Sequence, residues 1–239
     1  MLSRIKNTLG SPDNSDLATY KALRAASKSW ADKLNHHPAA DRFDLFKAAR
    51  KVGISVQDRT FVFDDECEMA VMMDYYLLNY RPREKTLAET VSFAPGELAP
   101  LEAAFHEACL ASRTSLYLIT AVQDAHPRIQ LRDRLQPDRP ELWLTDIALA
   151  DSFRRIGGQA LLFTRVVAAQ GLHFTGGFSF VFEPKHEATL LDAYRRALWQ
   201  VAAHRRDEHR TGFFLGMNRR YGHQQDFADV EPPADRGPA

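Results

Sequence analysis

The sequence has 239 residues, and its 31 Lys and Arg residues are balanced by 31 Asp and Glu residues. This length favours one large domain or two small ones, and a hydrophobic content of 45% is sufficient for a core, which excludes global disorder. The balanced charge excludes a protein that binds polyanions through bulk charge alone.

The first half of the chain, residues 1–113, is predicted to be a helical region. Apolar residues recur at spacings of three and four in residues 15–35, which is the period of a helix with one buried face. Similar patterns predict helices at residues 40–52 and 100–112. The stretch ISVQDRTFVF, residues 54–63, is compatible with either a strand or a loop.

An acidic cluster opens the stretch FDDECEMAVMMDYYLLNY, residues 63–80. Asp65 and Glu68 have the spacing of a capping box, and acidic residues interact favourably with the positive end of a helix dipole. We therefore interpret the cluster as the start of a helix over residues 65–80, and not as a metal or catalytic site. Few polar residues follow, so this helix is expected to be buried on several sides.

Two charged residues stand inside apolar segments. Asp74 interrupts the apolar helix, and Arg165 interrupts the stretch LLFTRVV. Burial of an unpaired charge is costly, which leads to the hypothesis that Asp74 and Arg165 form an ion pair. The alternative is that Asp74 is a functional acid with a raised pKa.

Residues 114–183 are predicted to form a β-rich region. Five short segments rich in β-branched and aromatic residues are separated by turn signals, and they predict a small curled sheet or a partly open barrel. The segments cover residues 115–122, 128–135, 141–149, 159–168 and 172–182. Asp133 and Asp146 stand near the ends of two of them and are expected to make turn hydrogen bonds.

Residues 184–222 are predicted to pack back on the rest of the chain, with an amphipathic helix over residues 187–209 and a basic segment after it. The acidic, proline-containing residues 223–239 are predicted to be a disordered tail. The predicted fold class is therefore α+β, with a helical N-terminal half, a five-stranded curled sheet or barrel and a C-terminal amphipathic helix, all in one integrated unit.

Seven arginines and only two acidic residues lie in residues 195–220. This segment is a candidate binding surface, and nucleic acid is one possible ligand because arginine contacts phosphate groups. Together with Asp74 and Arg165, the candidate binding residues are Arg195, Arg196, Arg205, Arg206, Arg219 and Arg220.

The sequence contains no pattern that predicts a cofactor, a metal ion or a catalytic nucleophile. HEAC, residues 106–109, lacks the second histidine of a zinc-binding HExxH pattern, and GGFSF lacks the last glycine of GxSxG. The cysteines, Cys67 and Cys109, fall within predicted helices, which favours a reducing cytoplasm. Neither a secretory leader nor an apolar run long enough to cross a membrane is evident.

Three functions remain open. The leading hypothesis is a non-enzymatic binding or regulatory protein that contacts a nucleic acid or a protein partner. One alternative is a hydrolase-type enzyme that uses Asp74 in a cleft between the helical and β parts. The other is a structural subunit of an assembly or homo-oligomer, with Tyr75, Tyr76 and Trp199 partly at an interface.

The stretches MDYYLLNYR, residues 73–81, and LLFTRVV, residues 161–167, resemble a pattern found in an uncharacterised family of bacterial hypothetical proteins. The resemblance implies a helical first half and a strand-rich second half. It implies no activity.

Overall fold

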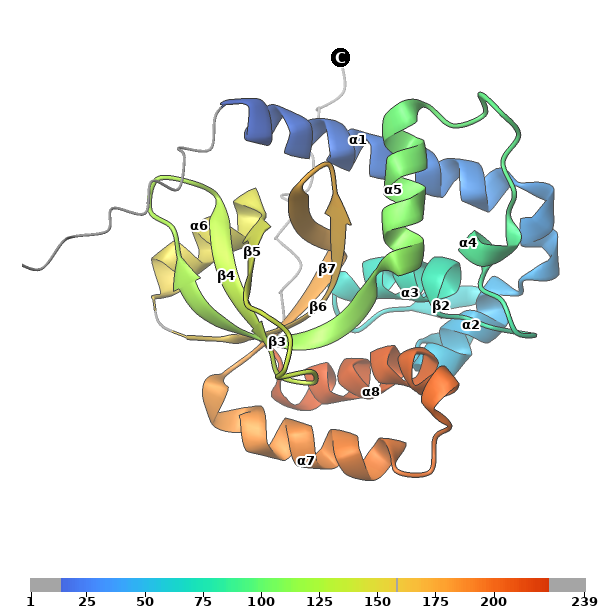
Figure 1. The fold of residues 1–239 in the computed structure, drawn as a ribbon. Coiled ribbons are helices and arrows are strands. Elements are labelled where there is room, and N and C mark those ends of the chain that lie inside the picture. The colour runs from blue at the N-terminus through green and yellow to red at the C-terminus, as the bar shows by residue number, and fades with distance from the viewer. Residues whose placement is uncertain (1–13, 158, 224–239) are drawn as a thin grey trace, which may run out of the picture.

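A five-stranded antiparallel sheet lies at the centre of the computed structural model, which describes residues 14–157 and 159–223. The strand order is β5-β4-β3-β6-β7, and helices pack around the sheet (Figure 1). The strands are β3 Arg113–Val122, β4 Arg128–Asp133, β5 Leu142–Thr145, β6 Leu161–Ala169 and β7 Leu172–Phe182. The predicted α+β class is confirmed.

The helices precede and follow the sheet in sequence, with one exception that lies between β5 and β6. Their bounds are α1 Asn14–His36, α2 Leu45–Val52, α3 Cys67–Leu78, α4 Leu87–Thr90, α5 Pro100–Ala111, α6 Ile147–Ile156, α7 Glu187–Leu198 and α8 Arg206–Tyr221. Short 3₁₀ helices are η1 Pro38–Arg42, η2 Pro184–His186 and η3 Ala203–Arg205, and a small hairpin consists of β1 Ser55–Gln57 and β2 Thr60–Val62.

The second predicted helix, residues 40–52, begins later than expected. Asp44 accepts a hydrogen bond from the Lys47 amide at 3.0 Å and so caps the start of α2, while η1 occupies the residues before it. The ambiguous stretch 54–63 forms the β1–β2 hairpin. Its turn residues Asp58 and Arg59 both have positive φ angles, as a tight hairpin turn requires.

The acidic cluster does start a helix, but its hydrogen bonds differ from those of the predicted capping box. Asp65 Oδ1 accepts from the Cys67 amide at 2.7 Å, and Glu68 Oε2 accepts from the Asp64 amide at 3.0 Å. Glu68 therefore reaches one residue further back than a capping box requires, and α3 begins at Cys67.

The sheet is curled but not closed into a barrel. Its edge strands β5 and β7 approach each other without pairing, and a side-chain bond joins this region, from Thr175 Oγ1 to Asp146 Oδ2 at 2.7 Å. The third predicted strand, residues 141–149, is wrong in its second half. β5 ends at Thr145, and Asp146 accepts from the Leu149 amide at 3.2 Å to cap α6.

The predicted single helix over residues 187–209 is also wrong. α7 ends at Leu198, and the chain reverses through η3 into α8, which reaches residue 221 (Figure 1). Phe214 and Leu215 on α8 are fully buried, so burial of this apolar pair stabilises the returning helix against the sheet. Apart from residue 223, the predicted tail lies outside the described residues.

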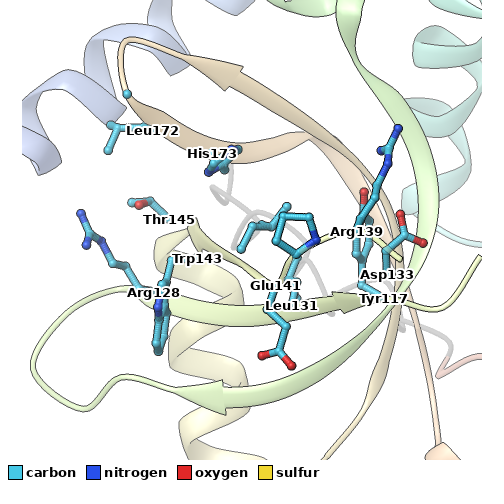
Figure 2. A pocket seen from close by; sticks show the side chains of 13 residues that line it. Tyr117, Arg128, Leu131, Asp133, Arg139, Glu141, Trp143, Thr145, Leu172 and His173 are labelled. Carbon is cyan, nitrogen blue, oxygen red and sulfur yellow. The ribbon is translucent and has the colours of Figure 1, made fainter. Parts of the chain in front are cut away.

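One large apolar core draws on all three predicted regions. It contains Leu23 from α1, Tyr75 from α3, Phe163 and Phe174 from the sheet, and Phe214 from α8. A second, smaller core lies between the sheet and α6. A cavity of about 600 Å³ is lined by residues of β3, β4, β5 and the β6–β7 turn (Figure 2).

Candidate functional site

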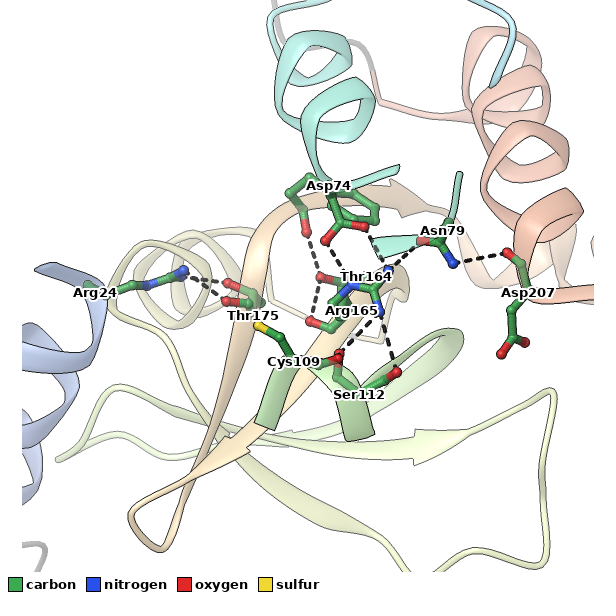
Figure 3. Close-up of polar contacts among 10 residues, drawn as sticks. Arg24, Asp74, Asn79, Cys109, Ser112, Thr164, Arg165, Thr175 and Asp207 are labelled. Atoms are coloured by element: carbon green, nitrogen blue, oxygen red, sulfur yellow. Dashed lines mark hydrogen bonds and ion pairs between the residues drawn. The ribbon is translucent and has the colours of Figure 1, made fainter. Parts of the chain in front are cut away.

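Asp74 and Arg165, from α3 and β6, form a buried ion pair (Figure 3). Arg165 Nε lies 2.8 Å from Asp74 Oδ1, and Arg165 Nη2 lies 2.9 Å from Asp74 Oδ2. Only 2% of the arginine side chain and 5% of the aspartate side chain are exposed. The hypothesis of a pair is therefore confirmed, and its bidentate geometry is the strong form of the arginine–carboxylate contact.

Polar groups from other elements complete the coordination of the guanidinium. Arg165 Nη1 donates to the Oγ atom of Ser112, the residue directly after α5, at 3.1 Å. Arg165 Nη2 also donates to Asn79 Oδ1. Asn79 Nδ2 in turn donates to the Asp207 carbonyl of α8 at 3.3 Å. A single buried charge thus connects the helical region, the sheet and the C-terminal helices (Figure 3).

Asp74 acts in this arrangement as a counter-ion. Burial by itself would lower the pKa of Arg165, but the Asp74 carboxylate outweighs burial and raises that pKa. A general base needs an oxygen that can reach a substrate, whereas both oxygens of Asp74 are bonded to Arg165. Cys109 lies close to the pair, and burial raises the pKa of its thiol, which keeps the thiol protonated.

Gly176 leaves the space that the Arg165 side chain occupies. A Cβ atom added at Gly176 would lie 3.0 Å from Arg165 Cβ and 3.1 Å from Arg165 Cδ. We expect Gly176→Ala to lower the free energy of unfolding by about 1–3 kcal/mol, measured by urea denaturation. The control is Gly216→Ala on α8, where a Cβ would meet nothing within 4 Å; equal losses in both variants would contradict the expected crowding.

Beside the ion pair, α1, α3, α5 and β7 enclose a groove of about 530 Å³, which we call the α1–α3 groove. Its apolar lining comes from Trp30, Met73, Leu77, Leu78 and Phe105. Trp30 Nε1 donates to His106 Nδ1 at 3.0 Å, and burial lowers the pKa of His106, so this imidazole stays a neutral acceptor. The hydrogen bond fixes the indole at the groove wall.

Two cations of α1 lie at the α1–α3 groove. Arg24 donates to Asp146 Oδ2 at 2.7 Å and to Thr175 Oγ1 at 2.6 Å, so its charge is largely compensated. Lys28 is exposed and makes no ion pair within the described part of the chain. Neither residue was predicted as a site residue, because a cation on one face of an amphipathic helix usually faces solvent.

The family that matches this chain covers the whole described region. A family model described as a family of unknown function, DUF7986, covers residues 14–228. The chain belongs to this family. A search of curated proteins finds no match, and a search of solved structures also finds none. Membership in DUF7986 agrees with the predicted resemblance to an uncharacterised family, while a bacterial origin stays a prediction.

Several arginines of the predicted basic surface are engaged within the protein. Arg219 Nε lies 2.7 Å from Glu68 Oε1, and Arg219 Nη1 donates to the Gly53 carbonyl at 2.9 Å. Arg205 pairs with Glu208 at 2.8 Å. Arg219 therefore holds α8 against the start of α3, a role that its position in a basic segment did not predict.

The remaining candidate arginines are exposed. Arg195 Nη1 lies 2.8 Å from Asp192 on the same helix, and Arg206 Nε donates to the Val201 carbonyl at 3.2 Å. Arg196 and Arg220 make no side-chain hydrogen bond or ion pair with described residues. α7 and α8 thus carry a basic surface that is smaller than the sequence predicted.

The described residues contain neither a metal-binding cluster nor a membrane-spanning helix. Within residues 14–157 and 159–223, no three His, Cys, Asp or Glu side chains are grouped so that they could hold a metal ion. Among the helices of the same ranges, none combines the length and the hydropathy that a membrane crossing needs.

Proposed function

We propose that the protein is a non-enzymatic binding protein whose ligand occupies the α1–α3 groove and combines an apolar body with an anionic group. The supporting observation is the groove itself, of about 530 Å³, which has a mainly apolar lining and the uncompensated cation Lys28. Small-molecule sites commonly have this size and this mixture of apolar walls and few polar groups. We expect the protein to act in a bacterial cytoplasm.

The geometry favours binding over the hydrolase alternative. Asp74 was the acid on which that alternative depended, and Arg165 occupies both of its oxygens. The ion pair instead supplies a rigid floor for the groove, because it holds α3 on β6. A preformed floor favours ligand affinity, since less conformational entropy is lost on binding.

Nucleic-acid binding stays a prediction. Its surface would consist of Arg195, Arg196, Arg206 and Arg220, since Arg219 is engaged with Glu68 and Arg205 with Glu208. Four dispersed arginines offer few phosphate contacts, which makes this version of a binding function weaker than the groove.

An assembly role also stays a prediction, although two of its proposed contacts are wrong. Tyr75 and Tyr76 are 1% and 5% exposed and pack in the core of their own chain. They are therefore not available to a partner. Trp199 is 82% exposed and could contribute to an interface.

Octanoate and octan-1-ol are suitable probes of the α1–α3 groove, because they share an apolar chain and differ in charge. We expect octanoate to bind more tightly, measured by ligand-detected NMR, and Ala70→Phe to weaken both ligands by filling the groove. Lys28→Gln should lower the affinity for octanoate by about two- to fivefold, since one exposed ion pair contributes at most about 1 kcal/mol. The affinity for octan-1-ol should stay unchanged.

The matched control is Lys21→Gln, which removes an exposed lysine of α1 that does not line the groove. It should leave octanoate binding unchanged. Octanoate binding that Ala70→Phe does not affect, or no octanoate binding at millimolar concentration, would overturn the proposal.

A further inference from the structure

Asp133, at the end of β4, has one carboxylate oxygen that is fully bonded and one that is not. Oδ1 accepts from Ser115 Oγ at 2.6 Å and from the amides of Leu135 and Gln136, both at 2.9 Å. Oδ2 is buried and has no hydrogen-bond partner within the described part of the chain. Buried carboxylate oxygens are normally satisfied, and Asp133 is one of the residues that line the cavity of about 600 Å³, so a bound group that donates a hydrogen bond would satisfy Oδ2.

The neighbours of Asp133 add a donor and a cation. Tyr117 lies directly opposite Asp133 in the β3–β4 register, and its hydroxyl makes no hydrogen bond with the described residues. Burial, and secondarily the Asp133 carboxylate, raises the pKa of Tyr117, so its hydroxyl stays a donor. Arg139 is exposed and unpaired among the described residues, and Figure 2 shows it beside Asp133 and Tyr117.

The same cavity of about 600 Å³ also has apolar walls (Figure 2). Leu131 from β4, Leu142 from β5 and Leu172 from β7 line it. A carboxylate, a guanidinium and an apolar wall are thus present in one cavity. These groups match the ammonium, the carboxylate and the side chain of an apolar amino acid.

We infer that this cavity binds a free amino acid with an apolar side chain, whose ammonium group donates to Asp133 Oδ2 and whose carboxylate lies against Arg139. Opposite charges are complementary at both ends, and the buried Asp133 oxygen gains the donor that the protein does not supply. The side chain of the ligand would pack on the leucines. This site is separate from the α1–α3 groove and goes beyond the proposed function.

L-leucine is the probe, tested by isothermal titration calorimetry against 4-methylpentanoate, which lacks the amine, and 3-methylbutylamine, which lacks the carboxylate. We expect leucine to bind and 4-methylpentanoate to bind at least about tenfold more weakly, because the buried Asp133 carboxylate is then left unpaired. We expect 3-methylbutylamine to bind about two- to fivefold more weakly, because Arg139 is exposed and its ion pair contributes at most about 1 kcal/mol. No leucine binding at millimolar concentration, or equal binding of 4-methylpentanoate, would overturn the inference.

Asp133→Asn is the decisive variant. The asparagine oxygen can keep the three bonds of Oδ1, while its amide nitrogen would replace the accepting Oδ2 with a donor. Leucine affinity should fall by about tenfold or more. Unchanged affinity would contradict the site, and Asp138→Asn, an exposed aspartate in the same loop, is the matched control.

Arg139→Gln keeps the inference testable if Asp133→Asn does not fold, because Arg139 is exposed. Arg139→Gln should weaken the binding of leucine and leave the binding of 3-methylbutylamine unchanged. Leucine affinity equal to that of the original protein would contradict the assigned orientation. Lys28→Gln should not affect leucine binding, so failure at one site is distinguishable from failure at the other.

Discussion

Replacing Asp74 by Asn is expected to lower the free energy of unfolding by about 3–5 kcal/mol. Arg165 is almost completely buried, and Asp74 is its only acidic hydrogen-bond partner among the described residues. Removal of the negative charge leaves a buried guanidinium that only neutral groups contact. Urea denaturation monitored by circular dichroism would measure the loss.

A double-mutant cycle separates the interaction free energy of Asp74 and Arg165 from the cost of altering the core at each position. Asp74→Leu and Arg165→Met should each be strongly destabilising, whereas the double variant should lose less than the sum of the two, because no uncompensated charge remains. Additive losses would show that the two side chains do not interact. Asp32→Asn on α1 is the control, since this aspartate is exposed and should change stability by no more than about 0.5 kcal/mol.

The ion pair could be predicted from the sequence because each charge is conspicuous among apolar neighbours. Asp74 and Arg165 are 91 positions apart, yet the cost of burying either charge alone requires a partner. The α1–α3 groove could not be predicted in this way. Arg24 and Lys28 have ordinary spacing on an amphipathic helix, and only the position of α1 across β7 brings them to a cavity.

The number of charged residues in a segment also fails to show which of them form ion pairs within the fold. Arg219 belongs to the basic segment in sequence, but its carboxylate partner Glu68 lies 151 positions away at the start of α3. The acidic cluster and part of the basic segment thus neutralise each other in the fold. Ion pairs between residues far apart in the sequence decide which surface arginines remain unpaired. The composition of a single segment does not reveal these pairs.

The errors in element boundaries have a related cause. The stretch ELWLTDIAL reads as one apolar segment, but Asp146 caps a helix within it, and Ala150 and Phe153 then face the second core. An aspartate near the end of a strand predicts a turn, and it predicts a helix cap equally well. Similarly, the reversal between α7 and α8 occurs without a glycine or a proline, so no local signal marked it.

The reversal after α7 places α8 against the sheet, where Phe214 is buried. We expect Phe214→Ala to lower the free energy of unfolding by about 3–5 kcal/mol. The Phe214 ring is fully buried, and its centroid lies 4.2 Å from that of Phe163 on the sheet. Truncation leaves a cavity that the stacked Phe163 ring cannot fill, because strand pairing on both sides holds its backbone.

Phe213→Ala is the matched control, because it removes the same side chain one position away, where the ring is only partly buried. Its loss in urea denaturation should be about half as large or less, in proportion to the smaller apolar area that it buries. Equal losses for the two variants would mean that α8 does not present Phe214 to the sheet. That result would contradict the packing of Phe214 on Phe163, which depends on the chain turning back before α8.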